Sequence, residues 1–539
     1  GGEMSRFGVI FLLLLLPIVA WGQERESYRD FLRPEIKSPK LAGPQHFRDH
    51  VVEGKLRLSL HDAIILTLEN NSNVHVQEAQ VEDAKFSVLR SFRPFDPQLQ
   101  TVFRGQRTAY PGFSQVQGAG TFNDLNQSAQ INYLQAFETG TNITVGLNST
   151  KDSSNSGFYF LNPYYQSFLN LQITQPLLRN AWRFPNQAPI LIARTNLQQS
   201  RLSFEAQVNT LMLQAITRYW AVVSAHNNLD VARKSQDAAD ATYQHDKRAL
   251  ELGALPPLDI YRSESEVASR RVQVIQAEYQ IKEAEENLRL VIGANQDPYV
   301  EALDIETTES PDPQGDLLAV DTATALQQAL ENRPEMLAWE RAVQGDDTTI
   351  RLAHNQLLPD LQLQMFYQGS GVGGNFNAGP VMTRGGLGTS LNQLFGFGYP
   401  GYGASLTLNL PIRNRAAQAD LGTALVSRHR DLYSAQQARE EITMEVRNAV
   451  HQLEQAKLTL AAGREALDLA QKTLSAEQRK AQLGAENIFF VLDAQTRVAN
   501  AEASLLQSEV DYQTAVAALH NATGSLLQDY HVQVAGLTQ

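Results

Sequence analysis

The sequence predicts an internally duplicated chain that combines a few β-strands with very long, paired α-helices. Two matching stretches, 252–293 and 483–524, each open with Leu-Gly-Ala and continue as five heptads, although Arg270 makes the seam of the first less regular. Each stretch follows a proline-free region long enough for a helix of about 60 residues, or about 90 Å. Alternating polar and apolar segments that end at a proline precede both long helices. An order of features that occurs twice indicates duplication.

Charge and cysteine content exclude several classes of function. The net charge of -13 argues against nucleic acid or an anionic membrane surface as a partner. The chain contains no cysteine, which excludes disulfides, thiolate metal sites, cysteine nucleophiles and an N-terminal lipid-modified cysteine.

The first residues read as a secretory signal peptide over 4–22. Arg6 supplies the positive region, and the apolar run over 9–19 is too short to span a bilayer, although a retained anchor is the alternative. The segment 23–55 is polar and contains three prolines, so we expect an extended N-terminal periplasmic segment. Because no later run reaches 18 apolar residues, a secreted chain of this kind is either soluble outside the cytoplasm or an outer-membrane β-barrel.

The first repeat is expected over 56–296. A helical region over 60–93, with Ser59 as its N-cap, comes before strands over about 97–175. These strands include a possible hairpin over 128–147 and a segment that stops at Pro176. Frequent aromatic residues beside alternating strands are typical of an outer-membrane barrel, but a soluble β-sandwich gives a similar alternation. Long helices over 187–252 and 258–293 complete the repeat.

The second repeat is expected over 320–530, after an acidic, proline-containing linker over 297–319. Its strands lie at about 359–411 and are separated by a glycine-rich loop over 369–398. Long helices over 416–482 and 487–523 follow, and 531–539 form a tail. Two clear strands per repeat, plus the possible hairpin, give four to six strands. Because a membrane barrel needs about eight, several chains must share one barrel.

This duplicated order resembles the TolC family of outer-membrane efflux channels over residues 58–529. The resemblance rests on the paired Leu-Gly-Ala turns, on the similar strand entries at Pro97 and Pro359, and on the stretches 175–179 and 490–494. It implies a mixed α and β membrane protein, in which three chains form one 12-stranded outer-membrane β-barrel. A periplasmic α-helical barrel of coiled-coil helices, about 100 Å long, would continue that barrel. The implied surroundings are outer-membrane lipid, a periplasmic adaptor protein and an inner-membrane pump.

The function implied by this resemblance is that of a passive exit duct in a tripartite efflux pump or a type I secretion system. The sequence offers no catalytic constellation, metal cluster or cofactor motif, so we expect neither an enzyme nor a bound cofactor. The glycines over 369–374 fit a dinucleotide fingerprint, but no helix is expected to start there, and we interpret them as an extracellular loop. A periplasmic coiled-coil scaffold without a pore and an outer-membrane enzyme are the alternatives.

The resemblance also implies two sites at the helix tips. The adaptor would dock on the two turns, which comprise Leu252, Gly253, Ala254, Leu483, Gly484 and Ala485. A periplasmic gate would be built near Asp493, which matches a family aspartate that faces the lumen, while Phe490 stands where a second one is expected. Glu486 replaces a family arginine that can hold the closed state, and Asp259 matches the acidic partner of that arginine. The family's closing salt bridge is therefore expected to be missing. In the alternative interpretation, Asp493 forms only a surface pair with Arg497.

Overall fold

The computed structural model describes residues 43–112, 120–157, 159–252, 256–258, 260–313, 315–378, 381–383, 385–483 and 488–532. The segment expected to be a signal peptide, 4–22, lies outside them. The chain divides into two units, each assembled from segments that are far apart in the sequence. The sheet unit contains Ser87–Arg194 and Gly345–Arg428, and the helix unit contains Leu41–Phe86, Thr195–Gln344 and His429–Gln539.

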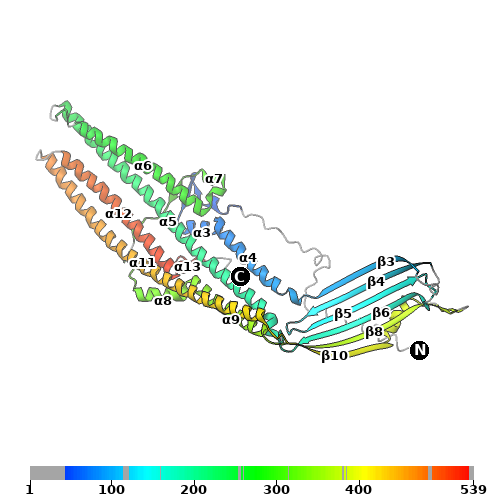
Figure 1. Cartoon of the computed structure of the whole chain (residues 1–539). Helices are drawn as coiled ribbons and strands as arrows, with labels where there is room; N and C mark the ends of the chain where they lie inside the picture. Colours follow the sequence, from blue (N-terminus) through cyan, green and yellow to red (C-terminus); the bar gives the residue numbers. More distant parts are fainter. Residues whose placement is uncertain are drawn as a thin grey trace. The chain divides into compact units, whose positions relative to one another are not determined.

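The sheet unit is built on one antiparallel sheet with the strand order β10-β8-β6-β5-β4-β3, and the short strand β9 pairs with β8 (Figure 1). The strands are β3 (Gln98–Pro111), β4 (Thr121–Ala136), β5 (Asn142–Ser154), β6 (Leu161–Pro176), β8 (Asp360–Ala378), β9 (Val381–Thr383) and β10 (Tyr399–Asn409). All neighbouring strands on this path are antiparallel, so β3 and β10 run in opposite directions at its two ends.

The sheet decides one alternative that the sequence left open, whether the hairpin joins the other strands, and it corrects one expectation, the glycine-rich loop. The possible hairpin is β4 and β5, and both strands belong to the sheet, so the chain contributes six long strands where a 12-stranded trimer needs four. The glycine-rich region is not a loop throughout, because β8 continues to Ala378 and helix α10 (Leu387–Phe395) follows. Because glycine has a low strand propensity, the second half of β8 was not predicted from the sequence.

The turn between β4 and β5 depends on one glycine. Gly140 has a φ of 84° and donates its N–H to the Phe137 carbonyl at 2.8 Å. A Cβ at Gly140 would lie 2.6 Å from the Asn180 carbonyl oxygen, so the position has neither the conformation nor the space for a side chain.

The helix unit is dominated by two pairs of long helices (Figure 1). The first pair is α5 (Arg183–Glu251) with α6 (Ile260–Ile292), and the second is α11 (Arg415–Gln482) with α12 (Ile488–Thr523). Helices α5 and α11 begin in the sheet unit and continue through the helix unit. The heptad seams are buried, as their spacing indicates: Val491, Ala494, Tyr512 and Leu519 on α12, and Ser263, Arg270, Val274 and Leu288 on α6.

The chain also contains shorter helices. They are α3 (Leu60–Asn70), α4 (Ser72–Ser91), α8 (Thr322–Asn332), α9 (Pro334–Gln356) and α13 (Leu526–Asp529). Ser59 caps α3 as expected, since its hydroxyl accepts from the Asp62 N–H and the Asp62 carboxylate accepts from the Ser59 N–H. None of the helices in the described residues has a stretch that is both long enough and apolar enough to cross a bilayer.

The two segments expected to be irregular are partly ordered. Residues of the N-terminal segment form η1 (Phe47–His50), β1 (Val51–Val52) and part of β2 (Lys55–Leu58). The expected linker contains α7 (Pro298–Glu301) and β7 (Ile305–Thr307), and β7 pairs in parallel with β2. Both segments supply apolar anchors, because Phe47 and Ile305 are buried in the main core of the helix unit. One buried side chain in a short polar segment gives no periodic signal, which is why the sequence did not predict them.

Candidate functional site

The long antiparallel sheet has one mainly apolar face and one mainly polar face. Residues that pair across antiparallel strands point to the same side, so the register assigns each residue to a face. One complete row across the six strands reads Leu99, Tyr133, Val145, Leu171, Tyr367 and Tyr402. The next row, on the opposite face, reads Gln100, Asn132, Gly146, Asn170, Gln368 and Gly401.

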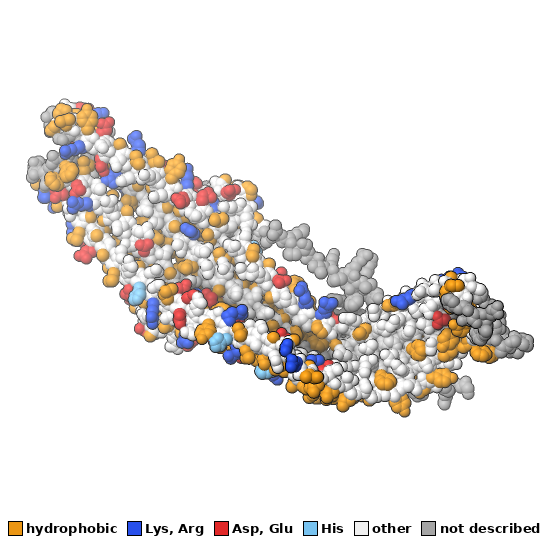
Figure 2. Space-filling model, in the orientation of Figure 1, with side chains coloured by type: hydrophobic (Ala, Val, Ile, Leu, Met, Phe, Trp, Pro, Cys, Tyr) orange, Lys and Arg blue, Asp and Glu red, His pale blue; other side chains and the backbone are white. Residues whose placement is uncertain are grey.

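This division matches the chemistry of a sheet that separates lipid from water. A membrane-spanning strand needs about 9–11 residues, and the six long strands contain 11 to 19. Charged side chains are dense over the helices and sparse over the sheet on the face that Figure 2 shows. A soluble β-sandwich would cover the apolar face with a second sheet, and the described part of the sheet unit contains none.

The two edges of this sheet are open. Strand β3 is exposed along its whole length, and β10 is exposed at nearly every residue. Within the described residues, β3 pairs only with β4 and β10 only with β8. Unpaired backbone groups are costly in lipid, so a sheet with these two edges is incomplete as a single chain in a membrane.

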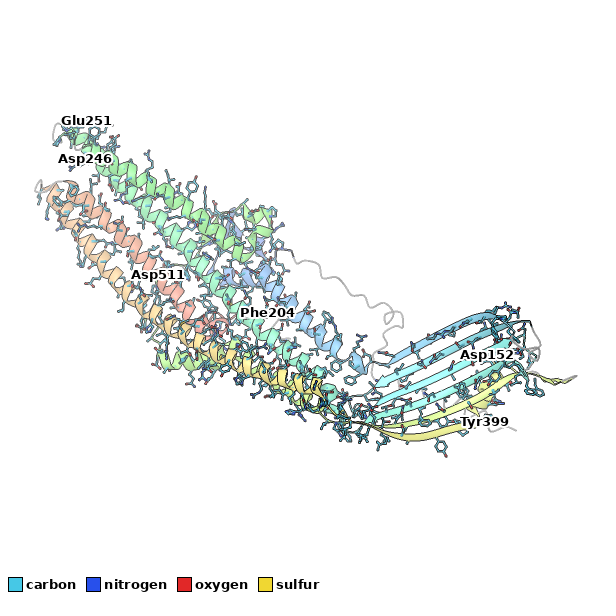
Figure 3. All side chains as sticks on the ribbon, viewed as in Figure 1. Asp152, Phe204, Asp246, Glu251, Tyr399 and Asp511 are labelled. Atoms are coloured by element: carbon cyan, nitrogen blue, oxygen red, sulfur yellow. The ribbon has the colours of Figure 1, made fainter. Side chains whose placement is uncertain are left out.

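Of the expected docking residues, Leu252 and Leu483 directly follow the last residues of α5 and α11. Glu251 and Asp246 mark that end of α5 in Figure 3. Leu252 and Leu483 are 84% and 83% exposed, so each offers an apolar side chain to solvent next to its turn. The other docking residues, Gly253, Ala254, Gly484 and Ala485, lie outside the described residues, as do Glu486 and Asp259 of the expected gate.

The two described gate residues lie in the first turns of α12. Phe490 is partly exposed, and its ring meets that of Phe489 edge to face with the centroids 5.5 Å apart. The Asp493 carboxylate lies 2.9 Å from the Arg497 guanidinium, four residues further along the helix. The surface pair of the alternative interpretation therefore forms, and it contributes about 0.2–0.5 kcal/mol at such an exposed position.

A polar link between the two repeats, close to these residues, was not predicted from the sequence. Arg270 on α6 is buried, and its Nη2 donates to Thr496 Oγ1 on α12 at 2.6 Å. Its Nε donates to Glu266 Oε1 at 2.7 Å. The signal was an arginine at a heptad seam position, where charge is disfavoured unless a partner is present.

A second buried polar contact joins α5 to α6 near their tips. Asp246 is almost fully buried, and its carboxylate accepts a hydrogen bond from Ser263. Ser263 is a small residue at a seam position of the first heptad stretch, so its hydroxyl lies directly against the facing helix.

Comparison with known proteins assigns the family. The model of the outer membrane efflux protein family matches residues 142–294 and 325–525, one block in each repeat. The chain belongs to this family. These two blocks confirm the duplication, and the assignment confirms the resemblance to TolC-family channels. The protein is thus an outer-membrane efflux channel that extends into the periplasm, and members of this family are transport proteins without enzymatic activity.

Individual members are distant in sequence and similar in fold. The outer membrane efflux protein BepC of Brucella suis is 22% identical over 361 residues, which cover 67% of this chain and 73% of BepC. TolC of Escherichia coli is 23% identical over 330 residues, which cover 60% of this chain and 63% of TolC, just under two thirds of its length. The crystal structure of the CmeC outer-membrane channel of Campylobacter jejuni superposes with a TM-score of 0.61 at 13% identity, covering 94% of this chain and 93% of that one. TolC-family channels are trimeric and work in tripartite pumps.

Proposed function

We propose that three copies of this chain form an exit duct that conducts solutes passively from periplasmic partners to the exterior. The observation that supports this most strongly is the pair of adjacent rows across the sheet, one apolar and one made of amides and glycines. Lipid would contact the first row, and a water-filled lumen would contact the second. The partners are an adaptor protein and an inner-membrane pump.

The ring closes through the two open edges of the sheet. Because the number of long strands is even, β3 and β10 of one copy run in opposite directions. When copies are related by rotation about the barrel axis, β3 of one copy is therefore antiparallel to β10 of the next. Three copies give a barrel of about 18 strands instead of the 12 expected from the resemblance. Since barrel diameter grows roughly linearly with strand number, this barrel is about one and a half times as wide as a 12-stranded barrel.

Reconstitution of the purified protein tests the function directly. Added to a planar lipid bilayer, the full-length protein should produce discrete conductance steps, and it should remain in outer membranes washed with salt or urea. A protein that leaves the membrane under those washes and produces no steps is a scaffold, contrary to this proposal.

We further propose that the two tip turns dock the adaptor. Leu252 and Leu483 expose apolar surface next to turns whose residues are small, so the tip of a partner's helices can approach closely. Gly484→Arg should abolish export and leave the trimer and its conductance intact, because the substitution lies far along the helices from the sheet. Gly484→Ala is the matched control and should retain export. Loss of the trimer in the arginine variant would show that the turn serves folding and not docking.

The gate is proposed at Asp493 and Phe490. Threefold symmetry makes a ring of three carboxylates and a ring of three phenyl groups from these positions, and a carboxylate ring favours cations. In single-channel recordings, Asp493→Ala should weaken cation selectivity, and Phe490→Ala should increase the current through the closed state. Arg497→Ala is the control, because it removes the surface partner and keeps the carboxylate ring. If Asp493→Ala and Phe490→Ala both conduct and select like the parent, neither residue lines the gate.

Arg270 and Thr496 are proposed to replace the closing salt bridge that Glu486 and Asp259 cannot form. Their hydrogen bond joins helices of the two repeats, and its geometry ties α12 to α6. Thr496→Val keeps the side-chain shape, removes the acceptor and leaves the buried guanidinium with Glu266 and Gln273. We expect a larger fraction of open time in this variant. An unchanged fraction would show that this bond does not restrain the gate.

A further inference from the structure

Helix α10 is seated directly on the backbone of β8. A Cβ added at Gly371 or Gly373 would collide with the carbonyl oxygen of Ser390 or Gly386, respectively. The Ser390 hydroxyl lies 2.8 Å from the Gly371 carbonyl oxygen, and Gln393 Oε1 accepts from the Val372 N–H at 3.0 Å. The glycines of β8 therefore form a flat surface on which α10 rests, called the glycine seat below. Polar side chains of α10 hydrogen-bond backbone groups of β8 beyond the last residue of β8 that pairs with β10.

The seat is on the apolar face of the sheet. A Cβ at Gly369 would point at Leu394 of α10, and Gly369 shares its row with Leu169, Leu147 and Ile131. The ring of Phe397, just after the helix, meets that of Tyr367 with the centroids 6.2 Å apart. The row of Gly371 also contains Ser167 and Ser149, and the Ser390 hydroxyl donates to Ser167 Oγ at 2.8 Å. Helix α10 thus covers a patch of the otherwise apolar face where glycines and serines replace large side chains, and it does not lie on the amide-lined face.

The outward side of α10 is itself apolar. Leu387, Leu391 and Phe395 are spaced by four residues and line one flank of the helix. Leu387 and Phe395 are 43% and 47% exposed, and Phe397 is 58% exposed. Residues 387–398 include no charged residue. A short exposed segment with this composition continues the apolar surface on which it rests.

We propose that α10 is an interfacial helix on the outside of the barrel, with Leu387, Phe395 and Phe397 inserted in the outer leaflet of the outer membrane. This rests on the proposed barrel. The helix lies in the connection from β8 to β10, at the end of the sheet opposite to the ends from which α5 and α11 continue, so it faces the exterior side. An apolar helix flank with aromatic side chains is suited to the boundary between acyl chains and head groups.

Spin labels on introduced cysteines test this, because the chain has no cysteine of its own. Three single variants are labelled in trimers reconstituted into phospholipid vesicles: Phe395→Cys, Leu147→Cys and Asn148→Cys. Leu147 and Asn148 are neighbours on β5 that belong to opposite faces. Collision with oxygen, which partitions into lipid, is compared with collision with a water-soluble nickel chelate.

The Phe395 label should resemble the Leu147 label, with high access to oxygen and low access to nickel. A Phe395 label that resembles the Asn148 label would place α10 in water and overturn the inference, while the barrel remains supported. Equal behaviour of the Leu147 and Asn148 labels would instead refute the barrel itself. Adding Gly371→Val, which removes the seat, should raise nickel access at Phe395 and leave Leu147 unchanged. An unaltered Phe395 label in that background would show that the glycine seat does not position the helix.

Discussion

Replacing Leu147 with arginine is expected to eliminate the folded oligomer from the outer membrane, whereas Asn148→Arg is tolerated. The two residues are adjacent on β5, but Leu147 pairs with Leu169 on the apolar face and Asn148 pairs with Phe168 on the other. An arginine on the lipid face costs about 2–4 kcal/mol near the midplane, and a trimer incurs that cost three times. On the lumen face the same side chain remains hydrated.

Membrane fractionation and heat-modifiable migration in gels would measure this difference. Leu147→Ala is the control for lost packing and should assemble, because alanine is tolerated by lipid. If both arginine variants assemble equally, the two faces of the sheet do not meet different solvents. The assignment of lipid and lumen would then be wrong.

Removing Glu285 is expected to destabilise the helix unit by about 3 kcal/mol, near the lower end of the range for breaking a buried ion pair. Glu285 and Arg289 have side chains that are 5% and 7% exposed, and their charged atoms are 3.0 Å apart. The Glu285 carboxylate also accepts from the Ile305 N–H at 3.3 Å, so it connects α6 to β7. In Glu285→Ala the guanidinium stays buried with a weaker set of partners.

Glu286→Ala is the matched control, because Glu286 contacts the same arginine but is 61% exposed. Its loss should cost less than about 1 kcal/mol. Guanidinium denaturation followed by helical circular dichroism measures both variants. Equal midpoint shifts for the two would contradict a special role of the buried pair.

The contribution of Glu285 should also depend on pH. Burial raises the pKa of this carboxyl, but the nearby His226 ring and the charge of Arg289 outweigh that effect and hold the pKa below its usual value. A lowered folded-state pKa means that the stabilisation is present above the ordinary glutamate pKa of about 4.3. It is lost as the pH falls through the folded value. The difference between parent and Glu285→Ala should therefore shrink below about pH 4.

Regular periodicity made the helices predictable from the sequence. The heptads that end at Gly293 and Gly524 specify a buried seam over many turns, and their bounds differ from the structure by only a few residues. The strand entries at Pro97 and Pro359 were equally informative, because the alternation begins at once after each.

Features without a period were not predictable. The run of glycines in β8 gives no alternation, and its meaning depends on α10, which lies about 20 residues later and packs on it. The short strand β7 is ordered by its pairing with β2, a contact between distant segments. Arg270 was visible as an irregular seam residue, but only the position of Thr496 on the opposite repeat explains it.

Closure of the ring through β3 and β10 is tested most directly by a disulfide between copies in this cysteine-free chain. Gln100→Cys on β3 is combined with Thr407→Cys on β10, and Ser405 and Asn409 are tried in place of Thr407 to cover the register. All four positions belong to the polar face. Oxidation of membranes should give covalent species of one, two and three chains and nothing larger in at least one combination. A ladder that stops at two chains would mean a 12-stranded dimer, and monomers alone in all three combinations would contradict closure through these edges.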